Sequence, residues 1–145
     1  MKEKWPEAIR ENAIEYGTVV FHGEMVPYAV LSREINRDLP GFVGCFKQEG
    51  ESFFFISEDV PVEFRSPQVV HEVMEFKELG ERPGSCLQSL MFELELLPEE
   101  LREEYIPFRR EFFRRLLPYC ATHAQWYPAQ RLRDFQESLD YLEKM

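Results

Sequence analysis

The sequence predicts one α+β domain over residues 1–145, with a small antiparallel sheet from the N-terminal half packed with four or five helices, mostly C-terminal. Short β-branched and aromatic runs between glycine-containing turns fill the first sixty residues. Apolar residues at helical spacing fill most of the rest. No repeat, low-complexity tract or linker divides the chain, and its length suits a single domain.

The N-terminal half begins with a predicted helix from Pro6 to Tyr16, because proline suits a first helical position and a glycine follows. Two hairpins come next, with strands over residues 18–22, 25–31, 42–46 and 52–56. Between them, residues 32–39 favour a short helical turn. Pro27 cannot donate to a strand ladder, so its strand should lie at a sheet edge or begin after it.

A helix from Pro67 to Leu79 is the element around which we expect the domain to be organised. Ser66 suits its N-cap and Gly80 suits the residue after its end. Its apolar side is wider than the usual stripe, which predicts packing on more than one side. That apolar set comprises Val69, Val70, Val73, Met74, Phe76 and Leu79.

Three further helices are predicted after Gly80. The first covers residues 85–97, where leucine, glutamate and methionine favour a helix over the strand-like alternation at its centre. The second covers residues 98–117, with Pro107 kinking or dividing it and Pro118 ending it. The last begins near Pro128.

Composition favours an acidic cytoplasmic protein. The net charge of −10 disfavours nucleic acid and anionic lipid as partners and would favour a basic protein. No apolar run is long enough to span a membrane, and the first residues lack the apolar segment of a secretory signal. The sequence has an odd number of cysteines, each flanked by apolar residues: Cys45, Cys86 and Cys120. This pattern predicts free thiols, at least two of them buried.

The segment His71-Glu72-Val-Met-Glu75 resembles the His-Glu-x-x-His signature of the zincin metalloproteases, in which the histidines bind zinc and the glutamate activates water. Glu75 stands where that family has its second histidine, and carboxylates also bind zinc. The resemblance implies His71 and Glu75 as ligands, Glu72 as general base, and Glu78 or a distant residue as third ligand. A solvated polar helix face explains the same pattern.

Other motifs are incomplete. Cys120 and His123 have half the spacing of a zinc site, but no second pair accompanies them. No local signature singles out a cysteine–histidine nucleophile, and no phosphate-binding loop is present. The arginine pairs at 109–110 and 114–115 have Glu111 between them and further glutamates one or two turns upstream, as on a solvated helix face.

Two functions are therefore expected from the sequence. The preferred one is a non-catalytic acidic binding or regulatory protein, such as an immunity-type inhibitor of a basic partner, which needs no cofactor. Its contact residues would be Trp126, Tyr127, Glu58 and Asp59, because aromatic side chains and loop carboxylates are typical of such surfaces. The alternative is a zinc-dependent hydrolase of degenerate zincin type centred on His71, Glu72 and Glu75.

Overall fold

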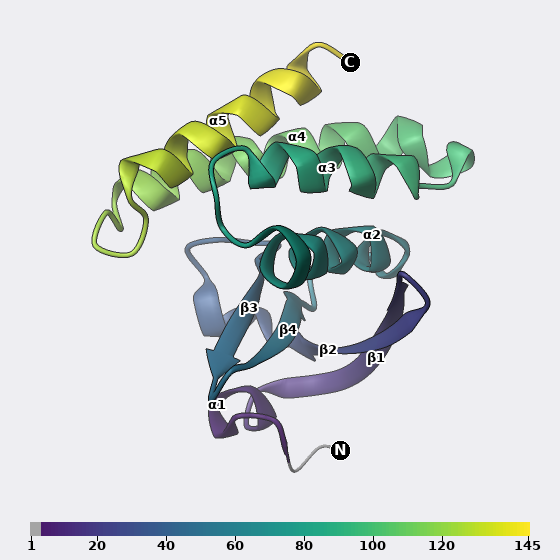
Figure 1. The fold of residues 1–145 in the computed structure, drawn as a ribbon, viewed down its shortest axis with the longest axis vertical. Coiled ribbons are helices and arrows are strands. Elements are labelled where there is room, and N and C mark those ends of the chain that lie inside the picture. The colour runs from purple at the N-terminus through teal and green to yellow at the C-terminus, as the bar shows by residue number, and fades with distance from the viewer. Residues whose placement is uncertain (1–3) are drawn as a thin grey trace.

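The computed structural model describes residues 4–145 and has an α+β fold, as the sequence predicts. Helix α2 (Val62–Val73) lies between a four-stranded sheet on one side and three C-terminal helices on the other (Figure 1). Those helices are α3 (Ser85–Glu95), α4 (Glu99–Ala121) and α5 (Ala129–Glu143). This layered order places α2 in the interior, which confirms that it packs on more than one side.

The sheet is mixed, with strand order β1-β2-β4-β3. Its strands are β1 (Ala13–Phe21), β2 (Glu24–Leu31), β3 (Val43–Gln48) and β4 (Glu51–Ser57). Both predicted hairpins are present as antiparallel pairs, and a parallel pairing of β2 with β4 joins them. A 3₁₀ turn, η2 (Arg33–Asn36), lies where the sequence predicts a short helical turn, and Ser32 caps it.

Pro27 lies in an interior strand, so the expectation that its strand would be an edge is wrong. The parallel ladder between β2 and β4 begins at Tyr28, one residue after the proline. Pro27 itself stands opposite Thr18 in the β1 pairing. The missing N–H therefore lies outside the β4 ladder, which is how an interior strand accommodates it.

The predicted N-terminal helix is wrong over most of its length. Helix α1 covers only Glu7–Arg10, and the residues from Ala13 onward belong to β1. A helix of this length is marginal by itself. Pairing with β2 instead satisfies the backbone groups of residues 13–17, so tertiary contacts override the local pattern.

Helix α2 begins at Val62, five residues before the predicted start, with Pro61 at its N-cap. Pro67 thus lies inside the helix and not at its first position. At Met74 the helix widens into a π-helical segment, η3 (Met74–Leu79), which ends at Gly80 with φ +70°. Such π-turns are rare and occur often at functional sites.

Helix α4 runs unbroken through Pro107 and Pro118, so the predicted division and the predicted end are both wrong. Each proline removes the donor to the carbonyl four residues earlier. The residues concerned, Glu103 with Pro107 and Arg114 with Pro118, are all exposed. Water can therefore bind the released carbonyls, while the buried side of the helix holds it together.

The three thiols are free, and Cys86 and Cys120 are buried, as predicted. Among the described residues, no helix combines the length and apolarity needed to cross a membrane.

Candidate metal centre

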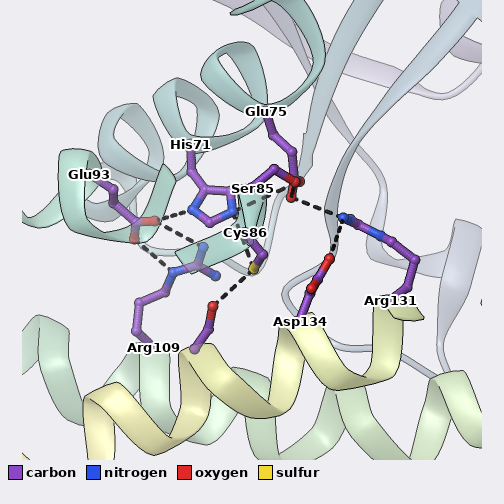
Figure 2. Close-up of polar contacts among 9 residues, drawn as sticks. His71, Glu75, Ser85, Cys86, Glu93, Arg109, Arg131 and Asp134 are labelled. Carbon is purple, nitrogen blue, oxygen red and sulfur yellow. Dashed lines mark hydrogen bonds and ion pairs between the residues drawn. The ribbon is translucent and has the colours of Figure 1, made fainter. Parts of the chain in front are cut away.

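A buried polar cluster lies between α2 and the C-terminal helices. His71 and Glu75 stand on the side of α2 and η3 that faces away from the sheet, and each is only 2% exposed. The simple expectation of a solvated polar face is therefore wrong. Helices α3, α4 and α5 cover this side and direct further polar side chains into it (Figure 2).

Glu93 fixes the imidazole of His71. Its Oε1 lies 2.8 Å from Nδ1 of His71, and its two oxygens accept from Nε and Nη2 of Arg109 at 2.7 and 3.1 Å. The hydroxyl of Tyr105 donates to the same carboxylate. Burial by itself would raise the pKa of Glu93, but the charge of Arg109 and the hydrogen bond with His71 outweigh it and hold that pKa at about 2.

An ionised carboxylate can only accept hydrogen bonds, so Nδ1 of His71 must carry the proton that Glu93 receives. In the neutral ring this leaves a lone pair on Nε2. That atom lies 3.8 Å from Sγ of Cys86 and 4.0 Å from Oε1 of Glu75. A carboxylate that orients a histidine in this way is the usual outer partner of a metal-binding imidazole.

Cys86 and Glu75 are held in place by groups from α3 and α5. Ser138 on α5 donates to Sγ of Cys86 at 3.1 Å. Oε2 of Glu75 accepts from Arg131 at 3.2 Å and from Ser85 at 3.4 Å. Its other oxygen is the one nearest to His71 (Figure 2).

Nitrogen, sulfur and oxygen donors thus converge at one point. One ligand atom from each of His71, Glu75 and Cys86 lies within 4.8 Å of the others. Zinc bonds of about 2.0–2.3 Å in a tetrahedral site place neighbouring donor atoms about 3.4–3.6 Å apart. The distances from Nε2 of His71, 3.8 and 4.0 Å, lie just above this range. The donor set is one that zinc favours.

Burial and the neighbouring Glu75 raise the pKa of Cys86 well above its ordinary value. Without a bound metal ion, a thiolate of Cys86 next to the carboxylate of Glu75 is unfavourable at this buried position. A bound metal ion reverses this preference, because it deprotonates a coordinating thiol.

Glu78, the third ligand that the resemblance offered, lies outside this cluster. It is 44% exposed at its side chain and contacts His22 near the surface. Glu78 would share a helix face with His71 and Glu75 at 3.6 residues per turn. That spacing does not hold in η3, where the turn is wider.

The cluster opens onto a cleft of about 770 Å³. Its wall includes His71, Glu72, Glu75, Cys86, Arg109 and Arg131, together with many aromatic and aliphatic side chains. Glu72 is 9% exposed and, among the described residues, has no hydrogen-bond or ion-pair partner. Burial and, after it, the charge of Glu75 raise the pKa of Glu72 well above its usual value.

The four residues proposed to contact a partner have different environments. Trp126 is 66% exposed and Tyr127 is half-buried, and both line the cleft. Glu58 accepts from the backbone N–H of Arg33, and Asp59 accepts from that of Gly41. Neither carboxylate lines the cleft. Binding of a basic protein through these residues stays a prediction.

Sequence reasoning misses Cys86 as a candidate ligand. It also misses the residues that hold His71 and Glu75 in place, which are Glu93, Arg109 and Arg131. These residues come from three different helices, and none has a motif. One signal was available, because Glu93 lies within the apolar run from Leu90 to Leu97. A carboxylate inside such a run must be paired if the helix is buried.

Comparison with protein families, with curated proteins and with solved structures finds no match for this chain. The evidence for a function therefore comes from the candidate site alone.

Proposed function

We propose that this protein is a zinc-dependent hydrolase with His71, Glu75 and Cys86 as metal ligands and Glu72 as general base. One observation carries the proposal: three buried donors of different types converge at the floor of a cleft. Three protein ligands leave one coordination position for water or substrate, as in catalytic zinc sites. The contact between His71 and Glu93 supplies the outer support that such sites use.

Zinc would supply an activated water and would polarise the bond to be cleaved. Glu72 would receive a proton from that water and pass it to the leaving group. Its place in the cleft wall and its lack of an ion-pair partner suit this role. The raised pKa of Glu72 brings its proton affinity closer to what a general base needs near neutral pH.

A second candidate is a cysteine hydrolase with Cys86 as nucleophile, His71 as base and Glu93 as the group that orients the base. The specific observation is the order of contacts, from Sγ to Nε2 at 3.8 Å and from Nδ1 to Oε1 at 2.8 Å. Cys86 also lies in the first turn of α3, where the helix dipole favours a thiolate.

The zinc site is preferred because it explains Glu75. In the metal-free pocket, burial opposes thiolate formation at Cys86, and the second anion beside it opposes it further. Around a metal ion, the same carboxylate becomes a ligand. The cysteine-hydrolase candidate assigns it no role.

Metal analysis of protein purified without a histidine tag tests the first proposal. We expect about one zinc ion per chain, lost in the Cys86→Ser and His71→Ala variants. Matched controls remove a cysteine and a histidine outside the cluster, Cys120→Ala and His22→Ala, and should keep the zinc. Absence of stoichiometric zinc from folded wild-type protein supplied with zinc would contradict the proposal.

The catalytic part is tested with Glu72→Gln. This variant should bind zinc like the wild type but lose hydrolysis of p-nitrophenyl acetate by 100-fold or more, since general-base catalysis contributes about 10²–10⁴ in rate. Activity that survives zinc removal but is abolished by iodoacetamide would instead support the cysteine hydrolase. Stoichiometric zinc without any hydrolysis would contradict the catalytic part alone.

A further inference from the structure

Three aromatic rings form a stack that runs from the last turn of α4 into the loop before α5. The rings of Tyr119 and His123 have centroids 4.1 Å apart at 25°, and those of His123 and Trp126 lie 5.5 Å apart at 18°. Trp126 is the outer member of the stack. At 66% it is the most exposed of the described phenylalanine, tyrosine and tryptophan residues. A tryptophan this exposed leaves much apolar area in water.

Hydrogen bonds hold the stack together. Nδ1 of His123 donates to the backbone oxygen of Tyr119 at 2.7 Å, and the hydroxyl of Tyr119 accepts from Asn36 at 3.0 Å. The backbone N–H of Trp126 donates to the carbonyl oxygen of His123 at 2.9 Å. These contacts join the three rings to one another's backbone and to η2, so the indole of Trp126 is held by hydrogen-bonded neighbours.

The stack is part of the cleft that contains the candidate metal centre. Tyr119 and Trp126 line this cleft, and His123 does not. His123 covers one face of the indole of Trp126, and it does not cover the part of the indole that lines the cleft. Tyr127 and Pro128 continue the wall toward Arg131.

The charges of the cleft favour a ligand without negative charge. Arg109 is paired with Glu93, and Arg131 is paired with Glu75 and Asp134. Glu72 is the carboxylate of the wall without an ion-pair partner among the described residues. In the metal-free cleft, a bound anion would lie beside this carboxylate, and both arginines of the wall are already paired.

We propose that the cleft binds an aryl group without negative charge, stacked on the free face of Trp126. Because the candidate metal ligands line the same cleft, aryl-bearing esters or amides are the substrate class. That last step rests on the proposed function, but the binding of the ring does not.

Binding of four small probes by ligand-detected NMR tests this proposal. Benzyl alcohol and benzylamine carry an uncharged and a cationic aryl group, benzoate carries an anionic one, and cyclohexylmethanol is the saturated match of benzyl alcohol. In protein without zinc, we expect benzyl alcohol and benzylamine to bind more tightly than benzoate. Cyclohexylmethanol should bind more weakly than benzyl alcohol, because it lacks a π-face.

The variant Trp126→Ala should weaken binding of benzyl alcohol roughly two- to tenfold, the usual range for one aromatic pair. Trp126→Phe should keep most of the affinity. Phe46→Ala removes another exposed aromatic ring, one outside the cleft, and should change nothing. Because Trp126 is exposed, these variants should fold like the wild type.

Equal affinity of wild type and Trp126→Ala for benzyl alcohol would overturn the proposal, as would equal binding of cyclohexylmethanol and benzyl alcohol. The same titrations on Cys86→Ser separate this proposal from the metal centre. Ring binding that depends on Trp126 and persists in protein without zinc supports the stacking site even if the hydrolase proposal fails. Zinc binding without ring binding would contradict the stacking site and would leave the hydrolase proposal standing.

Discussion

At the scale of single residues, Glu93 determines what His71 can do. It is fully buried, and its carboxylate receives hydrogen bonds from His71, Arg109 and Tyr105. A buried ion pair is not in itself a strong stabilising element, because both charges lose their hydration. The pair is easier to understand as a support that keeps the Nε2 lone pair of His71 directed at the other ligands.

We predict that Glu93→Gln lowers zinc affinity about 10- to 100-fold, the usual effect of removing an outer carboxylate. It should also lower the free energy of unfolding by about 3–5 kcal/mol, because Arg109 is left buried without a counter-charge. Zinc titration and urea unfolding measure the two effects.

The double variant Glu93→Gln with Arg109→Met separates them. Removal of the unpaired charge should restore part of the stability but not the zinc affinity. If affinity returned together with stability, Glu93 would be only a structural residue.

The residues of the candidate site were partly predictable. His71, Glu72 and Glu75 form a local motif, so the sequence alone marks them. Cys86 lies fifteen positions from His71 and belongs to another helix, and Glu93 is further still. Their approach depends on how α2 and α3 pack, which no short motif encodes.

At the scale of elements, the π-helical segment η3 sets the position of Glu75. It begins three residues after His71 and ends at Gly80, whose φ of +70° and ψ of 172° lie in a region essentially restricted to glycine. Gly84 also has a positive φ, of +84°, but its ψ of −4° places it in the left-handed region that asparagine tolerates.

We predict that Gly80→Asn lowers the free energy of unfolding by about 1–3 kcal/mol through backbone strain. The matched variant Gly84→Asn should change it by less than about 0.5 kcal/mol, and asparagine is also a good N-cap there. A Cβ meets no atom within 4 Å at either position, so crowding does not explain a difference. Equal urea midpoints for the two variants would contradict this assignment.

Sequence patterns predicted most elements and failed where tertiary contacts decide. The hairpins, α3 and α5 follow from turn residues and apolar spacing. Residues 13–16 were expected in a helix and instead belong to a strand that pairs with β2. Pro118 was expected to end α4, but exposure of the carbonyl four residues earlier lets the helix continue to Ala121. Neither outcome is visible in the local sequence.

At the scale of the whole molecule, the candidate site joins the two halves of the fold. His71 and Glu75 come from the element that covers the sheet, and Cys86 comes from the helical layer. Ser138 and Arg131 on α5 hold Cys86 and Glu75 from the far side. A metal ion bound here would link the sheet with all these helices, and the cleft would then present it to an aryl-bearing molecule.

The most direct test of the central claim is a crystal structure of the zinc-loaded protein with anomalous diffraction at the zinc edge. We predict one strong anomalous peak about 2.0–2.3 Å from Nε2 of His71, Sγ of Cys86 and a carboxylate oxygen of Glu75. The fourth position should hold water and face the cleft. Zinc bound only at another place, such as the surface pair His22 and Glu78, or no peak between these three residues, would contradict the account.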